Sequence, residues 1–289
     1  MDPKILQVII NAISLSLIYI LFATGLTLIM GIFDVCNFAY GEFVMVGGFA
    51  TYFIVAKYHI SYIVAPLAAM VIVSLIGIVF EKGIFYPMRN RGGLEPALAT
   101  FGSSSILQTA VLILFGGMPL GVPAILSGKI SIGSAYFPAD RIPIIFGALF
   151  MIVLLFLFVQ KTKLGLAIRA LQQDQDAAAL QGMNISSIRI VVWIVASCLA
   201  AVAGVLLSSI HYVDPWMGSG YLLKGFAVVI IGGLGSIPGA LIGGFILGFV
   251  DSFGQTYITT SSFFSSYLFA FAFIMLVLIV RPQGLLGKR

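Results

Sequence analysis

The sequence predicts an all-α membrane protein that crosses the bilayer about eight times. Of its 289 residues, 61% are hydrophobic and 9% are charged, whereas a soluble domain carries about 25% charged residues. The mean hydropathy of +1.14 excludes a water-facing surface over most of the chain. Long apolar runs recur from one end to the other, and a spanning helix needs about 20 such residues. We therefore treat residues 1–289 as a single transmembrane domain.

Seven apolar runs have the length of one membrane span each. They are residues 5–31, 38–56, 62–80, 98–115, 142–159, 188–210 and 263–280. The first run is longer than the roughly 7–15 apolar residues of a signal peptide, and no small-residue cleavage site follows it, so we expect a retained helix. A further apolar region, 222–253, is too long for one span and is interrupted by GGLGSIPG at 232–239. We expect two half-helices or a tight hairpin there.

Basic residues set the expected orientation, because Lys and Arg gather in cytoplasmic loops. Three basic groups should therefore be cytoplasmic: Lys82, Arg89 and Arg91; Lys161, Lys163 and Arg169; and Arg281, Lys288 and Arg289. Counting spans then places the N-terminus outside, and the C-terminus and the GGLGSIPG break toward the cytoplasm. Residues 118–141 become an outer loop, in which alternation over 129–137 predicts a short hairpin. A disordered connector is the alternative.

Residues 161–187 form a polar segment that separates two apolar runs. Apolar residues recur there at near-helical spacing and polar residues fall on another face, which predicts a docking helix outside the bilayer over 164–181. Gly182 is its expected stop, and Asn184 or Ser186 the expected cap of the next helix. The alanines at 177–179 would let another surface approach closely. A helix resting on lipid headgroups would carry more Lys and Arg, with Trp or Phe on its apolar face, so we favour docking to a protein.

Three motifs together resemble a family of transporters. They are GLAIRA at 165–170 with DQDAAA at 174–179 and GMN at 182–184; NFAYGEF at 37–43; and GGLGSIPGA at 232–240. This combination is similar to the LivH-type branch of permeases in ATP-driven ABC importers of branched-chain and other hydrophobic amino acids, and it covers nearly the whole chain. Tyr40 departs from the family's N-x-A-H-G-E-F pattern, in which His is common. Ligand preference could differ if Tyr40 touches the substrate path.

The resemblance implies that residues 161–187 are a cytoplasmic coupling segment seated in a groove of an ATPase subunit. The implied contact residues are Gly165, Arg169, Ala170, Asp176, Ala177, Ala178 and Gly182. The expected partners are a second homologous permease, two ATP-binding subunits that use ATP and Mg²⁺, and a periplasmic or surface-anchored substrate-binding protein. The chain has no G-x-x-x-x-G-K-[ST] motif and so no P-loop of its own. We expect a non-catalytic subunit without a bound cofactor, surrounded by lipid in a bacterial or archaeal cytoplasmic membrane, with no nucleic-acid partner.

Glu42 is the leading candidate for the substrate pathway, because an ionisable group within a span is costly and faces protein or water. It could line or gate the path, or it could hydrogen-bond a helix terminus and hold a broken helix in place. Hydroxyl groups at 100–105 could bond a substrate carboxylate or satisfy backbone groups at a helix start. The candidate pathway residues are Asn37, Tyr40, Gly41, Glu42, Thr100 and Ser103.

Glycines recur every four residues in and after the GGLGSIPG break. Small residues at this spacing let membrane helices pack with their backbones close together. Unwound backbone at such a break can also form a translocation site. The candidate packing and hinge residues are Gly232, Gly233, Gly235, Gly239 and Gly243.

The remaining polar residues suggest no separate chemistry. Asp251 is interpreted as a surface or helix-end residue, and Glu81, Lys82 and Glu95 as solvated loop edges. No cluster of His, Cys or Asp predicts a metal site. Cys36 and Cys198 are expected to be small packing residues rather than a disulfide.

Other functions remain open at this stage. A permease of the same family could carry urea, short amides or aromatic acids. A secondary transporter independent of ATP would need no coupling helix and more intramembrane ionisable residues than Glu42 and Asp251. An intramembrane enzyme would need a Ser/His, His/Glu or paired-Asp arrangement, and the spans show none.

Overall fold

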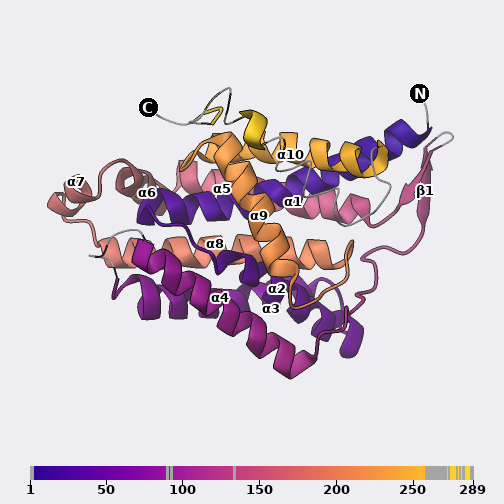
Figure 1. Ribbon diagram of the computed structural model, residues 1–289, viewed down its shortest axis with the longest axis horizontal. Coiled ribbons are helices and arrows are strands. Elements are labelled where there is room, and N and C mark those ends of the chain that lie inside the picture. Colours follow the sequence, from indigo (N-terminus) through magenta and orange to yellow (C-terminus); the bar gives the residue numbers. More distant parts are fainter. Residues whose placement is uncertain are drawn as a thin grey trace.

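The computed structural model describes residues 3–88, 91, 94–132, 135–257, 272, 274–277, 279, 281 and 284–286. These residues form a bundle of long helices with one small hairpin (Figure 1). The helices are α1 (Pro3–Phe33), α2 (Tyr40–Thr51), α3 (Val64–Phe80), α4 (Leu94–Phe115), α5 (Arg141–Lys161), α6 (Lys163–Gln173), α7 (Gln175–Leu180), α8 (Ile185–Ser208), α9 (Met217–Gly232) and α10 (Ile237–Tyr257). Among them, α1, α3, α4, α5, α8 and α10 are long and apolar enough to cross a membrane.

A short helix, α2, lies inside the bundle. All its residues except Val46 are buried, and it packs against α3, α8 and α9. Twelve residues of α-helix rise about 18 Å, which is too little for a hydrocarbon core of about 30 Å. The chain continues as a π-helical turn, Tyr52–Lys57. The predicted span at 38–56 is therefore one continuous helical segment, Tyr40–Lys57, that changes from α to π geometry at Tyr52.

The glycine-rich region forms the predicted hairpin of two helices, α9 and α10. Gly233 ends α9 with a φ of 99°, which favours glycine. Across the hairpin, a Cβ at Gly239 would overlap the Gly232 carbonyl oxygen, and one at Gly243 would lie 2.5 Å from the Val228 carbonyl oxygen. Because these residues lack side chains, the two backbones lie in direct contact.

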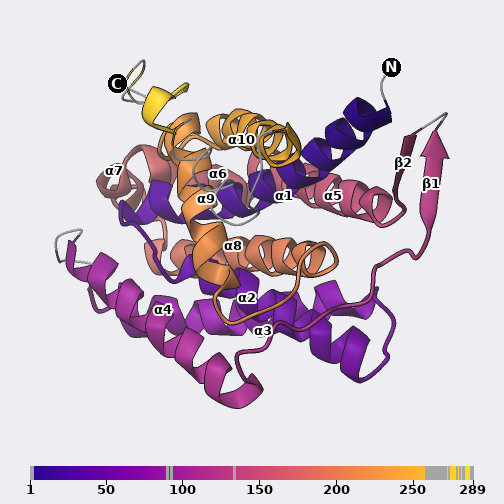
Figure 2. The ribbon, with the colours of Figure 1, turned by 45° about the vertical axis from the view of Figure 1, so that its right-hand side comes forward.

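The two ends of the bundle carry different structures (Figures 1 and 2). At one end the antiparallel strands β1 (Lys129–Ile132) and β2 (Ala135–Pro138) form the predicted hairpin, which packs beside α1. At the other end α6 and α7 project beyond the bundle. The backbone N–H of Leu285 donates to Ile231 O, so residues 284–286 lie beside the α9–α10 turn.

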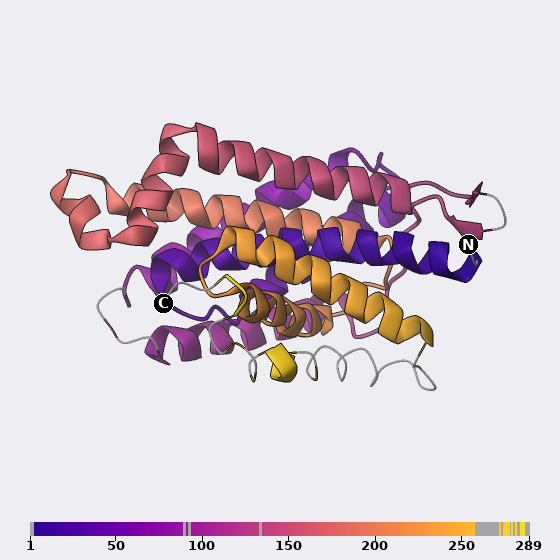
Figure 3. The ribbon, with the colours of Figure 1, turned by 90° about the horizontal axis from the view of Figure 1, so that it is seen from above.

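Seen from above, α10 crosses α1 while α5 runs along one side of the bundle (Figure 3). The predicted span 263–280 lies mostly outside the described residues. Arg89, Lys288 and Arg289 also lie outside them.

The polar segment contains two helices, so the prediction of one docking helix over 164–181 is wrong. Asp174 has extended backbone, with φ −159° and ψ 111°, and ends α6. Its carboxylate accepts hydrogen bonds from the backbone N–H groups of Asp176 and Ala177 and so caps α7. Gly182, with a φ of 78°, lies just past the end of α7, and Asn184 caps α8, both as predicted.

Candidate functional site

The projecting helices α6 and α7 are hydrogen-bonded and packed to the C-terminal end of α1. The Gln175 side-chain amide donates a hydrogen bond to the Ile32 carbonyl oxygen, one of the carbonyls that a helix end leaves without a partner. The Gln172 amide nitrogen packs over Gly31, where a Cβ would lie 2.9 Å from it. A displacement of α6–α7 therefore acts directly on α1.

Arg189 makes a second link, in the first turn of α8. Its Nε lies 3.2 Å from Oε1 of Glu81, and its guanidinium lies 4.4 Å from the centre of the Phe33 ring. Glu81 is 2% exposed, so its interpretation as a solvated loop edge is wrong. The cation of Arg189 compensates the buried carboxylate. Arg189 thus joins the ends of α1, α3 and α8 just beyond the coupling segment.

The outermost apolar side chain of α6–α7 is Leu180, which is 89% exposed. Ala178, placed by the sequence in a contact patch, is 3% exposed and packs into the chain instead. Ala179 is exposed and Ala177 is half-buried. The surface that α7 offers to a partner is therefore centred on Leu180.

The other predicted coupling residues divide between inner and outer faces. Gly165 is buried against the last turn of α5, where a Cβ would overlap the Phe158 carbonyl oxygen. Arg169 turns toward α5 and donates from Nη1 to Gln160 Oε1 at 3.2 Å. Asp176 and Gly182 are exposed, and Ala170 is half-buried.

Glu42 lies where α2, α4 and α9 meet. It is 1% exposed and accepts a hydrogen bond of 3.0 Å at Oε1 from Ser104 Oγ. Within the described part of the chain, Oε2 has no hydrogen-bond partner, and it faces Gly218, whose Cβ would lie 2.6 Å away. Ser103, the predicted neighbour, bonds Ala99 O of its own helix instead. Glu42 is therefore tied to a side chain of α4 rather than to a helix terminus.

Asn37 and Thr100 hold the backbone that leads into α2. Asn37 Oδ1 accepts from the Ala39 N–H at 3.0 Å, and Thr100 Oγ1 accepts from the Phe38 N–H at 3.1 Å. Gly41 brings α2 against α9, because a Cβ there would overlap the Gly218 carbonyl oxygen. These contacts give Asn37, Thr100 and Gly41 structural roles at the start of α2.

Tyr40 bridges three helices in the core. It is fully buried, and its hydroxyl donates to the Ala196 carbonyl oxygen of α8 at 2.8 Å. Its ring packs against Phe22 of α1, with centroids 4.9 Å apart. The hydroxyl occupies the space that a side chain at Gly25 would need. Tyr40 therefore belongs to the packing of α1, α2 and α8.

Replacing Tyr40 by phenylalanine is expected to cost about 1 kcal/mol of stability, because the buried hydrogen bond from its hydroxyl to the Ala196 carbonyl is lost. Substrate preference should stay the same, since the hydroxyl is enclosed by helices. Thermal unfolding in detergent and competition uptake would measure the two effects. Tyr212→Phe, at a side chain 69% exposed, is the control. A changed substrate preference in Tyr40→Phe alone would contradict the structural role.

A buried ion pair lies in the middle of the bundle. Lys224 of α9 places Nζ 2.8 Å from Oδ2 of Asp251 on α10. The Tyr19 hydroxyl of α1 donates to the same oxygen at 2.6 Å, and Gln255 donates to Oδ1 at 3.1 Å. Asp251 is 1% exposed, so its interpretation as a surface or helix-end residue is wrong. The sequence reading also missed Lys224, which occupies an apolar run.

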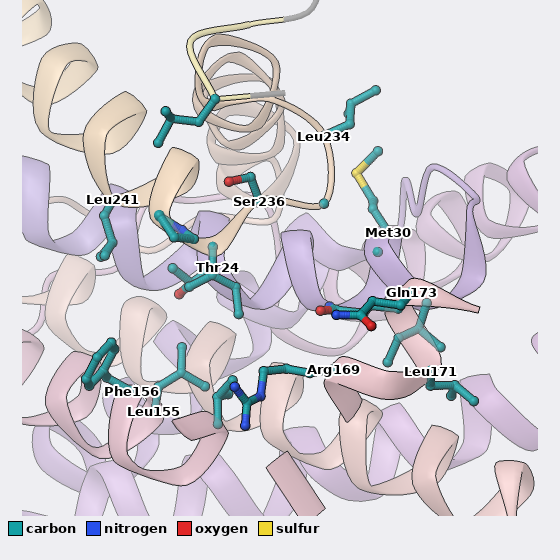
Figure 4. A pocket seen from close by; sticks show the side chains of 18 of the residues that line it. Thr24, Met30, Leu155, Phe156, Arg169, Leu171, Gln173, Leu234, Ser236 and Leu241 are labelled. Carbon is teal, nitrogen blue, oxygen red and sulfur yellow. The ribbon is translucent and has the colours of Figure 1, made fainter. Parts of the chain in front are cut away.

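A large cavity, ≈ 1030 Å³, opens at the end of the bundle that carries α6. Figure 4 shows Leu155 and Phe156 of α5 with Arg169 of α6 on one side, and Ser236 and Leu241 on the other. Thr24 of α1 lies between them. The cavity thus connects the coupling segment with the α9–α10 turn.

In the part of the chain that the structure describes, six membrane-length helices around a buried helix, with an exposed helix pair hydrogen-bonded to α1, are the architecture of a multi-pass membrane protein. Comparison with known protein families identifies the family to which the chain belongs. Residues 8–280 match the family model for the permease component of branched-chain amino acid transport systems, and the chain belongs to this family. Members are non-catalytic membrane components of transporters.

The chain aligns with named relatives over almost their full length. The chain is 33% identical to the high-affinity branched-chain amino acid transport system permease protein LivH of Escherichia coli K12, covering 98% of this chain and 96% of that protein. It is 30% identical, with the same coverage, to the permease protein BraD of Pseudomonas aeruginosa. Among solved structures, PsaBC from Streptococcus pneumoniae in complex with Fab aligns with a TM-score of 0.54 at 13% identity, covering 94% of this chain and 91% of that one. That likeness concerns the fold alone.

Proposed function

We propose that this chain is the permease subunit of an ATP-driven importer for branched-chain or other hydrophobic amino acids, which works by alternating access. Relatives that match over 98% of the chain carry that substrate class in their names. The observation that carries the proposal is the helix pair α6–α7, which projects from the bundle and is hydrogen-bonded to the end of α1 through Gln175. A transporter that changes conformation without a partner protein does not need a projecting helix pair bonded to a membrane helix.

In this proposal one ATPase subunit docks on α6–α7 and a second one docks on the partner permease, and the two hydrolyse ATP with Mg²⁺. Their closure displaces α6–α7, and two links pass the motion on. Gln175 pulls on the last turn of α1, and Arg189 moves Glu81 and Phe33 together with α8. Since α1 packs extensively on α10, the motion reaches the helix that carries Asp251 of the buried ion pair.

A second permease subunit would pair along α4. Only Pro96, Ala97, Thr100 and Val111 of this helix are buried. Its free face carries the hydroxyls of Ser105 and Thr109, both exposed. The Ser105 hydroxyl is satisfied by Phe101 O of its own helix. The most exposed large side chains of α4 are apolar, with Ile106 and Ile113 at 72% and 78%, so this apolar face could be covered by a second subunit. Glu42 and Ser104 lie directly behind it.

We place the protein in the cytoplasmic membrane, with α6–α7 and residues 284–286 in the cytoplasm. Lys161 and Lys163 at the junction of α5 and α6 satisfy the positive-inside rule for this orientation. The hairpin β1–β2 and the start of α1 then face outward, where a periplasmic or surface-anchored binding protein would deliver substrate.

Uptake into proteoliposomes tests the proposal. The full chain would be purified with its partner permease and ATPases, and supplied with the binding protein. Leucine, isoleucine and valine should accumulate only when both ATP and binding protein are present. Urea and aromatic acids, tested in the same panel, should not compete. Accumulation without ATP, or preferential uptake of urea or an aromatic acid, would refute the assignment.

A further inference from the structure

The cavity at the coupling end is a groove between two membrane helices. Its floor includes Thr24 of α1, its walls include Phe156 of α5 and Leu241 of α10, and Arg169 of α6 closes one end (Figure 4). α5 and α10 both pack on α1. The groove therefore runs along α1 and ends against the coupling segment.

The wall that α5 contributes is continuous with an apolar outer face. Phe146, Phe150 and Val153 on this helix are 67%, 64% and 48% exposed. Ile152 and Phe156 of the same helix are also apolar, and they line the groove. An apolar trough of this kind, at membrane depth, suits hydrocarbon chains.

The closed end of the groove is polar. Its charged lining residues are one cation, Arg169, and two anions, Asp34 and Asp174. Arg169 Nε and Gln172 Nε2 are buried donors without a hydrogen-bond partner among the described residues, and such groups are rare in folded proteins. Asp34 and Asp174 are exposed. The groove thus ends in unpaired donors next to two exposed carboxylates, of which that of Asp174 also caps α7.

We propose that this groove binds a zwitterionic phospholipid of the phosphatidylethanolamine type. The phosphate accepts from Arg169 and Gln172, the ammonium group meets Asp34 and Asp174, and an acyl chain lies against Phe156 and Leu241. The polar end lies where α5 ends at Lys161, which is headgroup depth. Its assignment to the inner leaflet rests on the orientation proposed above. Lipid binding itself does not depend on transport.

Two features favour a zwitterionic lipid over other ligands. An anionic headgroup without an ammonium group would be repelled by Asp34 and Asp174. A free amino acid has matching charges, but the cavity of ≈ 1030 Å³ is at the upper end of the roughly 300–1,000 Å³ that accommodates drug-sized ligands. The bound lipid would contact both α6 and the α9–α10 turn, and so would join the coupling segment to the helix hairpin.

Photo-crosslinking in nanodiscs tests the site. The full chain would be incubated with phosphatidylethanolamine that carries a diazirine in one acyl chain, and labelled peptides would be mapped by mass spectrometry. Labelling is expected around Phe156 and Leu241. Arg169→Met should reduce it about tenfold, since the phosphate loses a charged hydrogen-bond donor. Lys163→Met, an exposed cation on the same helix outside the cavity lining, should label like the unaltered chain.

A second variant covers the possibility that Arg169→Met does not fold. Leu241→Trp fills the apolar part of the groove, leaves Arg169 in place, and should also reduce labelling. Equal labelling by phosphatidylglycerol, loss of labelling with excess free leucine, or unchanged labelling in both variants would each overturn the proposal. None of these readouts requires the ATPases, so the outcome is independent of the transport assignment.

Discussion

Replacing Lys224 by methionine is expected to destabilise the protein by about 3–5 kcal/mol, because it leaves a buried carboxylate without its cation. Asp251 is 1% exposed, and its Oδ2 lies 2.8 Å from Lys224 Nζ. The Tyr19 hydroxyl and the Gln255 amide cannot supply the missing positive charge. The loss should appear as a lower midpoint of thermal unfolding in detergent and a lower amount of protein in the membrane.

The double variant Lys224→Met, Asp251→Leu separates charge from packing. Replacing a buried ion pair by apolar residues of similar size is often nearly neutral, so the double variant should recover most of the stability that Lys224→Met loses. Lys129→Met, at an exposed position on the β1–β2 hairpin, controls for the loss of a lysine. If Lys224→Met unfolded at the same temperature as Lys129→Met, the ion pair would contribute nothing to the fold.

The sequence could not reveal this ion pair. Lys224 and Asp251 are 27 positions apart on two helices, and hydropathy does not show which faces of those helices meet. Each charge taken alone is compatible with a helix end near the membrane surface. The same holds for Glu81, whose partner Arg189 lies beyond four intervening helices. Charged residues within a membrane domain have to be paired or face water, but the pairing is a tertiary property.

The membrane spans were predictable for a general reason. In lipid every backbone polar group must be satisfied within its own helix, so length and apolar composition alone identify α1, α3, α4, α5, α8 and α10. The glycines of GGLGSIPG likewise predicted the α9–α10 hairpin. Outside the membrane this constraint is absent. The break at Asp174 depends on whether its carboxylate caps a new helix, and the burial of Ala178 depends on tertiary packing.

Replacing Leu180 by aspartate is expected to reduce ATP-driven uptake about tenfold or more, the equivalent of at least about 1.4 kcal/mol of lost coupling. Leu180 ends α7 and is 89% exposed, so the change leaves the fold of the chain intact. In the assembled transporter the new carboxylate would be buried against the ATPase surface without a partner, which is costly. Uptake and ATPase co-purification, measured on the same membranes, would check this.

The control for Leu180→Asp is the same change at the opposite end of the molecule. Met118 is 81% exposed in the outer loop, and Met118→Asp should leave ATPase co-purification normal. Ala178→Trp is a poor test of docking, because Ala178 is buried and a large side chain there disturbs α7 itself. If Leu180→Asp supported normal uptake, the ATPase would have to engage α6 rather than α7. The exposed side chains Leu164 and Leu166 would then be the next positions to substitute.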